Sequence, residues 1–74
     1  MKAFNMYGYV KKLDEIRHGI EDAIDVGSDT GMMTAEELDR AKKQLNLCAM
    51  LTDAALRRRT AFLPDIRRFV KQYA

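Results

Sequence analysis

The sequence predicts an all-α protein: a long antiparallel helical hairpin with a short third helix across its open end. Apolar residues recur at steps of three and four along most of the 74 residues, which is the period of an amphipathic helix. Glycine, serine and aspartate gather only at residues 26–32, so the chain has one strong turn signal between two helical segments. We expect residues 1–74 to form a single domain, because a chain of this length has material for one core.

The first helix is expected at about residues 5–26. A single apolar stripe at helical spacing defines it and consists of Met6, Val10, Leu13, Ile16, Ile20, Ala23 and Ile24. Gly19 lies in the middle of this stretch, where glycine weakens a helix by about 1 kcal/mol relative to alanine. We interpret Gly19 as a point of close approach by a neighbouring helix. Gly27 follows the stripe and is predicted to end the helix in the left-handed conformation.

The second helix is expected at about residues 35–61 and begins with a capping box. The Thr34 hydroxyl can accept from the amide of Glu37, while the Glu37 carboxylate accepts from the amide of Thr34. Two apolar stripes follow along this helix. The first, which we expect to face the first helix, consists of Leu38, Ala41, Leu45, Cys48, Thr52 and Ala55. The second begins only halfway along the helix and needs a different cover; it consists of Leu47, Met50 or Leu51, Ala54 and Ala61.

A short third helix is expected at about residues 64–73, because Pro64 suits the first turn of a helix and disrupts its interior. This helix should cap the open end of the hairpin and gather the six aromatic residues there: Phe4, Tyr7, Tyr9, Phe62, Phe69 and Tyr73. Ten helical residues span only about 15 Å, against about 40 Å for the second helix. We therefore predict that the second stripe stays partly uncovered and binds a partner through Leu47, Met50, Leu51 and Ala54.

Charge is segregated along the chain, although the formal net charge is only +2. Residues 1–53 contain 7 Lys/Arg against 10 Asp/Glu, whereas residues 54–74 contain 6 against 1. In an antiparallel hairpin this order becomes spatial, with an acidic loop end and a basic open end. The acidic end consists of Glu21, Asp22, Asp25, Asp29 and Glu36. The basic patch, of a kind typical of nucleic-acid contacts, consists of Arg57, Arg58, Arg59, Arg67, Arg68 and Lys71.

Catalytic and cofactor chemistry is not indicated by the sequence. His18 is the only histidine and Cys48 the only cysteine, and they are far apart in the chain, so neither a Cys-His pair nor a zinc site is predicted. A single cysteine also excludes an internal disulfide and favours a reducing compartment, so we expect the protein in the cytoplasm. No segment approaches the roughly 18 apolar residues of a membrane span, and we expect no membrane partner, no cofactor and no metal.

The segment Asp25–Glu36 resembles the twelve-residue calcium loop of the EF-hand family, with carboxylates of Asp25, Asp29 and Glu36 at loop positions 1, 5 and 12. Gly27 supplies no side-chain ligand at position 3, and Thr30 replaces the glycine of position 6. A degenerate calcium site is therefore a minor alternative.

The pattern as a whole favours a small non-enzymatic protein that binds another macromolecule through an apolar helix face and charged ends. We expect a regulator, adaptor or inhibitor of the kind that phages and mobile elements encode. Its first expected partner is a second copy, which gives a homo-oligomer such as a dimer, and the next is a different protein. The alternative is a nucleic-acid-binding or nucleoid-associated regulator that uses the basic C-terminal third.

Overall fold

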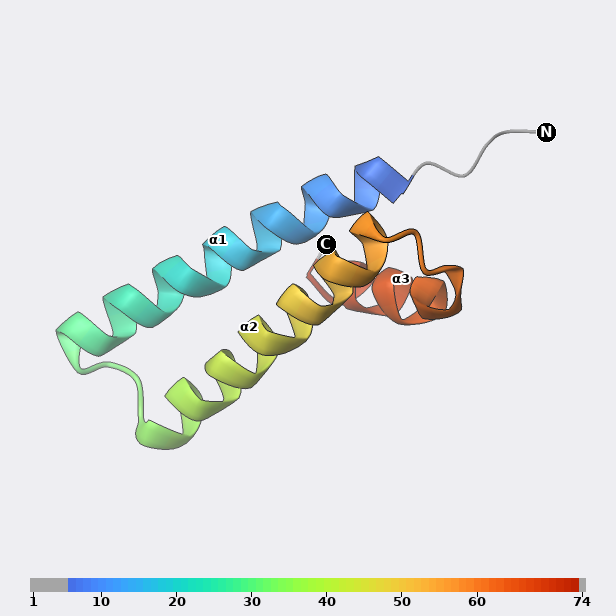
Figure 1. Cartoon of the computed structure of the whole chain (residues 1–74). Coiled ribbons are helices and arrows are strands. Elements are labelled where there is room, and N and C mark those ends of the chain that lie inside the picture. Colours follow the sequence, from blue (N-terminus) through green and yellow to red (C-terminus); the bar gives the residue numbers. More distant parts are fainter. Residues whose placement is uncertain (1–5, 74) are drawn as a thin grey trace.

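The fold is an antiparallel helical hairpin with a third helix packed against its open end, as predicted (Figure 1). The structure is a computed structural model and describes residues 6–73. Helix α1 spans Met6–Thr30, α2 spans Ala35–Leu56, a short 3-10 helix η1 spans Thr60–Phe62, and α3 spans Leu63–Gln72. The helices α1 and α2 pack along each other, and α3 contacts both of them. None of these described helices combines the length and the apolarity needed to cross a membrane.

The loop between α1 and α2 is shorter than predicted, because α1 continues past Gly27 to Thr30. The Thr30 hydroxyl donates to the carbonyl of Val26 at 2.7 Å, and the left-handed residue is Gly31, with a φ of 67°. Gly27 instead lies buried inside α1, where an added Cβ would overlap the side chain of Met33. The prediction that Gly27 ends the helix is therefore wrong, since the missing side chain of Gly27 makes room for Met33.

The start of α2 is as predicted, whereas its end comes at residue 56 rather than 61. Thr34 and Glu37 form both hydrogen bonds of the capping box, at 3.1 and 3.0 Å. At the other end Arg58 adopts a positive φ of 54°, and the amide of Arg59 donates back to the carbonyl of Ala54 at 2.9 Å. The chain therefore turns back before α3 begins, and Pro64 lies in the first turn of α3 as predicted.

The core lies toward the open end, where the three helices meet. Its central cluster consists of side chains that are at most 3% exposed: Leu13, Cys48, Leu51, Ala55, Ile66 and Phe69. A hydrogen bond also ties α2 to α1 inside this cluster, because the Cys48 thiol donates to the carbonyl of Leu13 at 3.2 Å. All three helices contribute to one core, so the position of α3 is set by side chains of both α1 and α2.

The aromatic residues gather at the open end only in part. Phe69 is buried and packs against Tyr73, with ring centroids 5.0 Å apart. Tyr7, in contrast, is 75% exposed, because it stands six positions before the buried Leu13 and thus about 120° around the helix from it. Phe4 lies outside the described residues.

Candidate functional site

The main surface feature is a groove along α1, which begins between α1 and the C-terminal end of α3 and continues between α1 and α2 toward the loop. Its larger part, of about 480 Å³, lies beside the C-terminal end of α3 and is lined by Lys12, Glu15, Ile16, Gly19, Ile20, Ala23, Val70 and Tyr73. A second part of about 280 Å³ continues toward the loop and is lined by Ile20, Ala23, Met33, Glu37, Arg40, Ala41, Gln44 and Tyr73. The two parts share Ile20, Ala23 and Tyr73, so together they form one surface, here called the hairpin groove.

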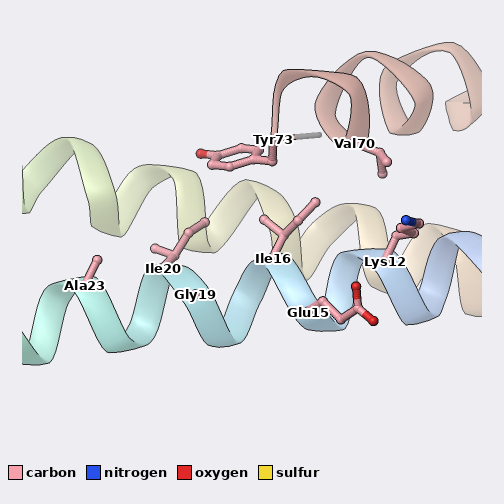
Figure 2. A pocket seen from close by; sticks show the side chains of 8 residues that line it. All are labelled: Lys12, Glu15, Ile16, Gly19, Ile20, Ala23, Val70 and Tyr73. Atoms are coloured by element: carbon pink, nitrogen blue, oxygen red, sulfur yellow. The ribbon is translucent and has the colours of Figure 1, made fainter.

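Figure 2 shows how α1 and α3 build the larger part of the hairpin groove. Ile16 and Ile20 point from α1 toward the end of α3, and Tyr73 lies above them. Ala23 stands beyond the last turn of α3 and is exposed. The third helix therefore covers α1 only about as far as Ile20, and the half of the groove nearer the loop is left uncovered.

Tyr73 marks the boundary between the covered and the uncovered half. Its hydroxyl donates to Oε1 of Gln44 on α2 at 3.1 Å, while its ring packs against Phe69. Burial raises the pKa of the Tyr73 hydroxyl, so this group stays protonated and able to donate at neutral pH. The hydrogen bond therefore helps to hold the last turn of α3 over the groove.

The two walls of the hairpin groove differ in chemistry. The wall from α1 is apolar toward the loop, because residues at helical steps of three and four bring Ile16, Ile20 and Ala23 to one side. The wall from α2 combines the apolar Ala41 with the polar residues Glu37, Arg40 and Gln44, and Met33 of the loop adds a further apolar side chain. A mainly apolar groove with polar side chains along one wall suits an amphipathic helix that turns its apolar face into the groove.

The four residues predicted to bind a partner, Leu47, Met50, Leu51 and Ala54, do not form an open surface. Leu51 and Ala54 are 1% and 3% exposed, and Leu47 is partly buried against the core. Only Met50 is exposed, at 51%, beside a shallow groove of about 290 Å³ between α2 and α3. The prediction of an uncovered stripe is wrong for Leu51 and Ala54, because α2 ends early and α3 folds back over this stripe.

The predicted basic residues are exposed and lie at the open end, on the turn after α2 and on α3. Within residues 6–73, hydrogen bonds or ion pairs are seen for three of the six. Arg57 donates to the carboxylate of Asp53 at 3.1 Å, as the spacing of one helical turn predicts, and Arg68 lies 3.8 Å from Asp65. Nε of Arg67 donates to the hydroxyl of Tyr9 on α1 at 3.3 Å. The fold thus brings the basic residues to one end and intersperses two carboxylates among them.

The predicted acidic residues lie at the loop end, in the second half of α1 and the first turn of α2. Asp25 and Asp29 both lie inside α1, and Glu36 lies in α2. The segment that resembles a calcium loop is therefore helical along its first half, and its carboxylates cannot wrap around one cation. Within the described residues, no group of three side chains of the types that bind metals comes together. The described residues thus show no geometry that supports the calcium alternative.

The cysteine and the histidine lie in separate environments. Cys48 is buried, and burial raises the pKa of its thiol, which keeps the group protonated and a poor nucleophile. His18 lies on the surface of α1, 3.5 Å from Asp14. Arg17 bonds the same Asp14 carboxylate at 2.7 Å, and this bond lowers the pKa of the Asp14 carboxyl group. These contacts join residues one turn apart, and such contacts stabilise a helix surface.

The sequence pattern does not predict the hairpin groove, because its spacing assigns Ile16, Ile20 and Ala23 to one stripe that faces α2. Gly19 is the feature of the sequence that could have indicated the groove, because it lies beside the stripe on α1 and carries no side chain. Comparisons with family models, with curated proteins and with solved structures find no match for this chain.

Proposed function

We propose that this protein is a small non-enzymatic interaction module of the cytoplasm, which binds a helical segment of another polypeptide chain in the hairpin groove. The observation that carries the proposal is the uncovered half of the groove, beyond Tyr73, where α1 presents Ala23 to solvent. Its buried cysteine, without a disulfide partner in the sequence, supports a reducing compartment.

The shape and position of the groove support this role. Packed helices form most of its walls, and surfaces on helices hold their geometry better than surfaces on loops. A partner helix would place one apolar stripe against Ile20 and Ala23 and its polar side toward Arg40 and Gln44. Ile20 is only 8% exposed, so the gain comes mainly from Ala23 and the other apolar atoms that remain exposed in the groove. Their burial stabilises a complex by roughly 25 cal/mol per Å² before the cost of association is subtracted.

Affinity capture with a variant of the groove tests the proposal. The tagged chain is incubated with a lysate of the source cells. Untagged copies of the chain are added to this lysate, so that a second copy can be captured as well as a different protein. Ala23→Arg places a charged side chain at the apolar wall, whereas Asn46→Arg adds the same side chain at an exposed position of α2 outside the groove. Circular dichroism confirms that both variants keep the helical fold.

A polypeptide retained by the wild type and by Asn46→Arg, and lost with Ala23→Arg, is the expected result. Equal retention by all three proteins, or retention of no polypeptide by any of them, would overturn the proposal. Retention that disappears after nuclease treatment and in the pair Arg58→Glu with Arg59→Glu would instead support the nucleic-acid-binding alternative, since those two residues belong to the exposed basic patch.

A further inference from the structure

The turn that ends α2 carries arginine at a position where helices favour glycine. Arg58 has a left-handed φ of 54°, and its amide donates to the carbonyl of Ala55 at 3.1 Å. The amide of Arg59 donates to the carbonyl of Ala54 at 2.9 Å. These two bonds form a Schellman motif, in which glycine is the usual left-handed residue and an apolar side chain often follows it. Arginine at position 58 therefore makes this cap less stable than glycine would.

The charge of the helix end does not require arginine at the left-handed position. Positive side chains near the C-terminal end of a helix interact favourably with its dipole, but Arg57 and Arg59 flank Arg58 and already supply positive charge there. The side chains of Arg58 and Arg59 are exposed, and within residues 6–73 they form neither an ion pair nor a side-chain hydrogen bond. Both guanidinium groups are therefore available to a ligand.

The outer side of α3 adds positive charge at the same end of the molecule. Arg67 and Lys71 are one helical turn apart, Arg68 follows Arg67, and all three are exposed. The hydrogen bond from Nε of Arg67 to the hydroxyl of Tyr9 orients that side chain. Arg68 is 80% exposed and 3.8 Å from Asp65, a pair that contributes little. The buried side of α3 is its apolar one, so its outer side has no apolar strip of the kind that enters a membrane.

We propose that the open end of this chain is a binding site for the phosphate backbone of a nucleic acid, with Arg58 and Arg59 as phosphate contacts that lower the stability of the cap of α2. Five of the six residues of the basic patch are arginine, and a guanidinium group donates paired hydrogen bonds that match a phosphate. Duplex DNA carries one negative charge per about 1.7 Å, so one backbone can contact several arginines at once. None of the six residues lines the hairpin groove, so this is a second binding site.

The shape of the molecule keeps its acidic end away from such a ligand. The chain extends 50 × 18 × 17 Å along its principal axes, and the acidic residues lie at the loop end, opposite the turn after α2 (Figure 1). Charges separated by more than about 10 Å are largely screened at 0.1 M salt. A duplex that meets the open end is therefore attracted by the basic patch and only weakly repelled by the loop end.

Fluorescence anisotropy with a labelled DNA duplex of about 20 base pairs tests the proposal on the full chain. The pair Arg58→Gly with Arg59→Gln should bind at least about tenfold more weakly than the wild type at about 100 mM salt. The slope of log affinity against log salt should fall by about 2, which is about one for each lost phosphate contact. Arg58→Gly alone should unfold at a higher temperature than the wild type and still bind the duplex more weakly, so loss of the fold is not the cause.

A matched control is the pair Lys42→Gln with Lys43→Gln, which removes two positive charges at exposed positions of α2 about 20 Å from Arg58 along the helix. This pair should change the affinity by less than about twofold. Equal weakening by the control pair, no binding by the wild type at about 50 mM salt, or a lower unfolding temperature of Arg58→Gly would each overturn the proposal.

Two other anions separate a nucleic acid from different acidic partners. Polyglutamate stands for an acidic protein, and phosphatidylserine vesicles stand for an anionic membrane. Tighter binding to either of them than to the duplex, at equal concentration of negative charge, would overturn the proposal. The proposed function is tested separately, because these variants leave the hairpin groove unchanged and Ala23→Arg leaves the basic patch unchanged.

Discussion

The packing of α3 on α2 predicts a large loss of stability when Leu51 is truncated. Leu51 is 1% exposed and belongs to the cluster in which all three helices meet. Leu51→Ala removes three carbon atoms, and each buried carbon contributes about 0.8 kcal/mol of transfer free energy, or about 2.4 kcal/mol together. The cavity left beside Phe69 adds to this loss, so we expect the free energy of unfolding to fall by about 3 kcal/mol. A chain of 74 residues has a total stability of about 4 to 11 kcal/mol, so the loss is readily measured.

Urea unfolding followed by far-ultraviolet circular dichroism measures this loss. With an m value of about 1 kcal/mol/M, the midpoint should fall by about 3 M while the m value stays the same. Leu56→Ala is the matched control, because Leu56 lies on the same helix and is 64% exposed; it should change stability by less than about 0.5 kcal/mol. All proteins are compared at one concentration, since self-association adds to the apparent stability. A Leu51→Ala protein as stable as Leu56→Ala would refute the assignment of Leu51 to the core.

Three further predictions concern the loop, the cap and the thiol. Gly27→Ala should lower stability by about 1 kcal/mol despite the higher helix propensity of alanine, because the new methyl group overlaps Met33; truncating Met33 to Ala in the same protein should restore the urea midpoint. Hydrogen bonds from Thr34 hold the pKa of Glu37 below its ordinary 4.5, so the wild type should lose stability as the pH falls below about 4.5, and Glu37→Gln should lose less between pH 6 and pH 3. Cys48 should react with an aromatic disulfide reagent slowly in the folded protein and rapidly in urea, and equal rates would contradict its burial.

The helices and most of their ends follow from local features of the sequence. The capping box of Thr34 and Glu37 and the position of Pro64 are read correctly, because each acts through its own neighbouring backbone groups. The end of α1 is predicted wrongly, because either of two glycines could be the left-handed residue that ends the helix. Gly31 takes the left-handed conformation, while Gly27 is needed inside the helix by Met33, a residue that reaches it only through the folded loop.

The predictions from the sequence differ most from the structure at the candidate site. The segregation of charge to two ends follows from the hairpin and the order of residues, and the structure places those residues accordingly. The sequence predicts the uncovered apolar surface on α2 around Leu51 and Ala54, whereas in the structure it lies on α1 around Ala23. A helix with two apolar sides must be covered twice, but its sequence does not state which neighbour covers which side.

The amino-acid sequence by itself determined the all-α class, the hairpin, the third helix and the opposite charges of the two ends, because helical periodicity and capping act within a few residues. Only the tertiary structure decided where α3 lies. The turn at Arg58 shortens α2 and sends α3 back over Leu51, and Tyr73 then ends its reach at Ile20. The uncovered half of the groove results from that docking position, which depends on how side chains distant in the sequence fill one core.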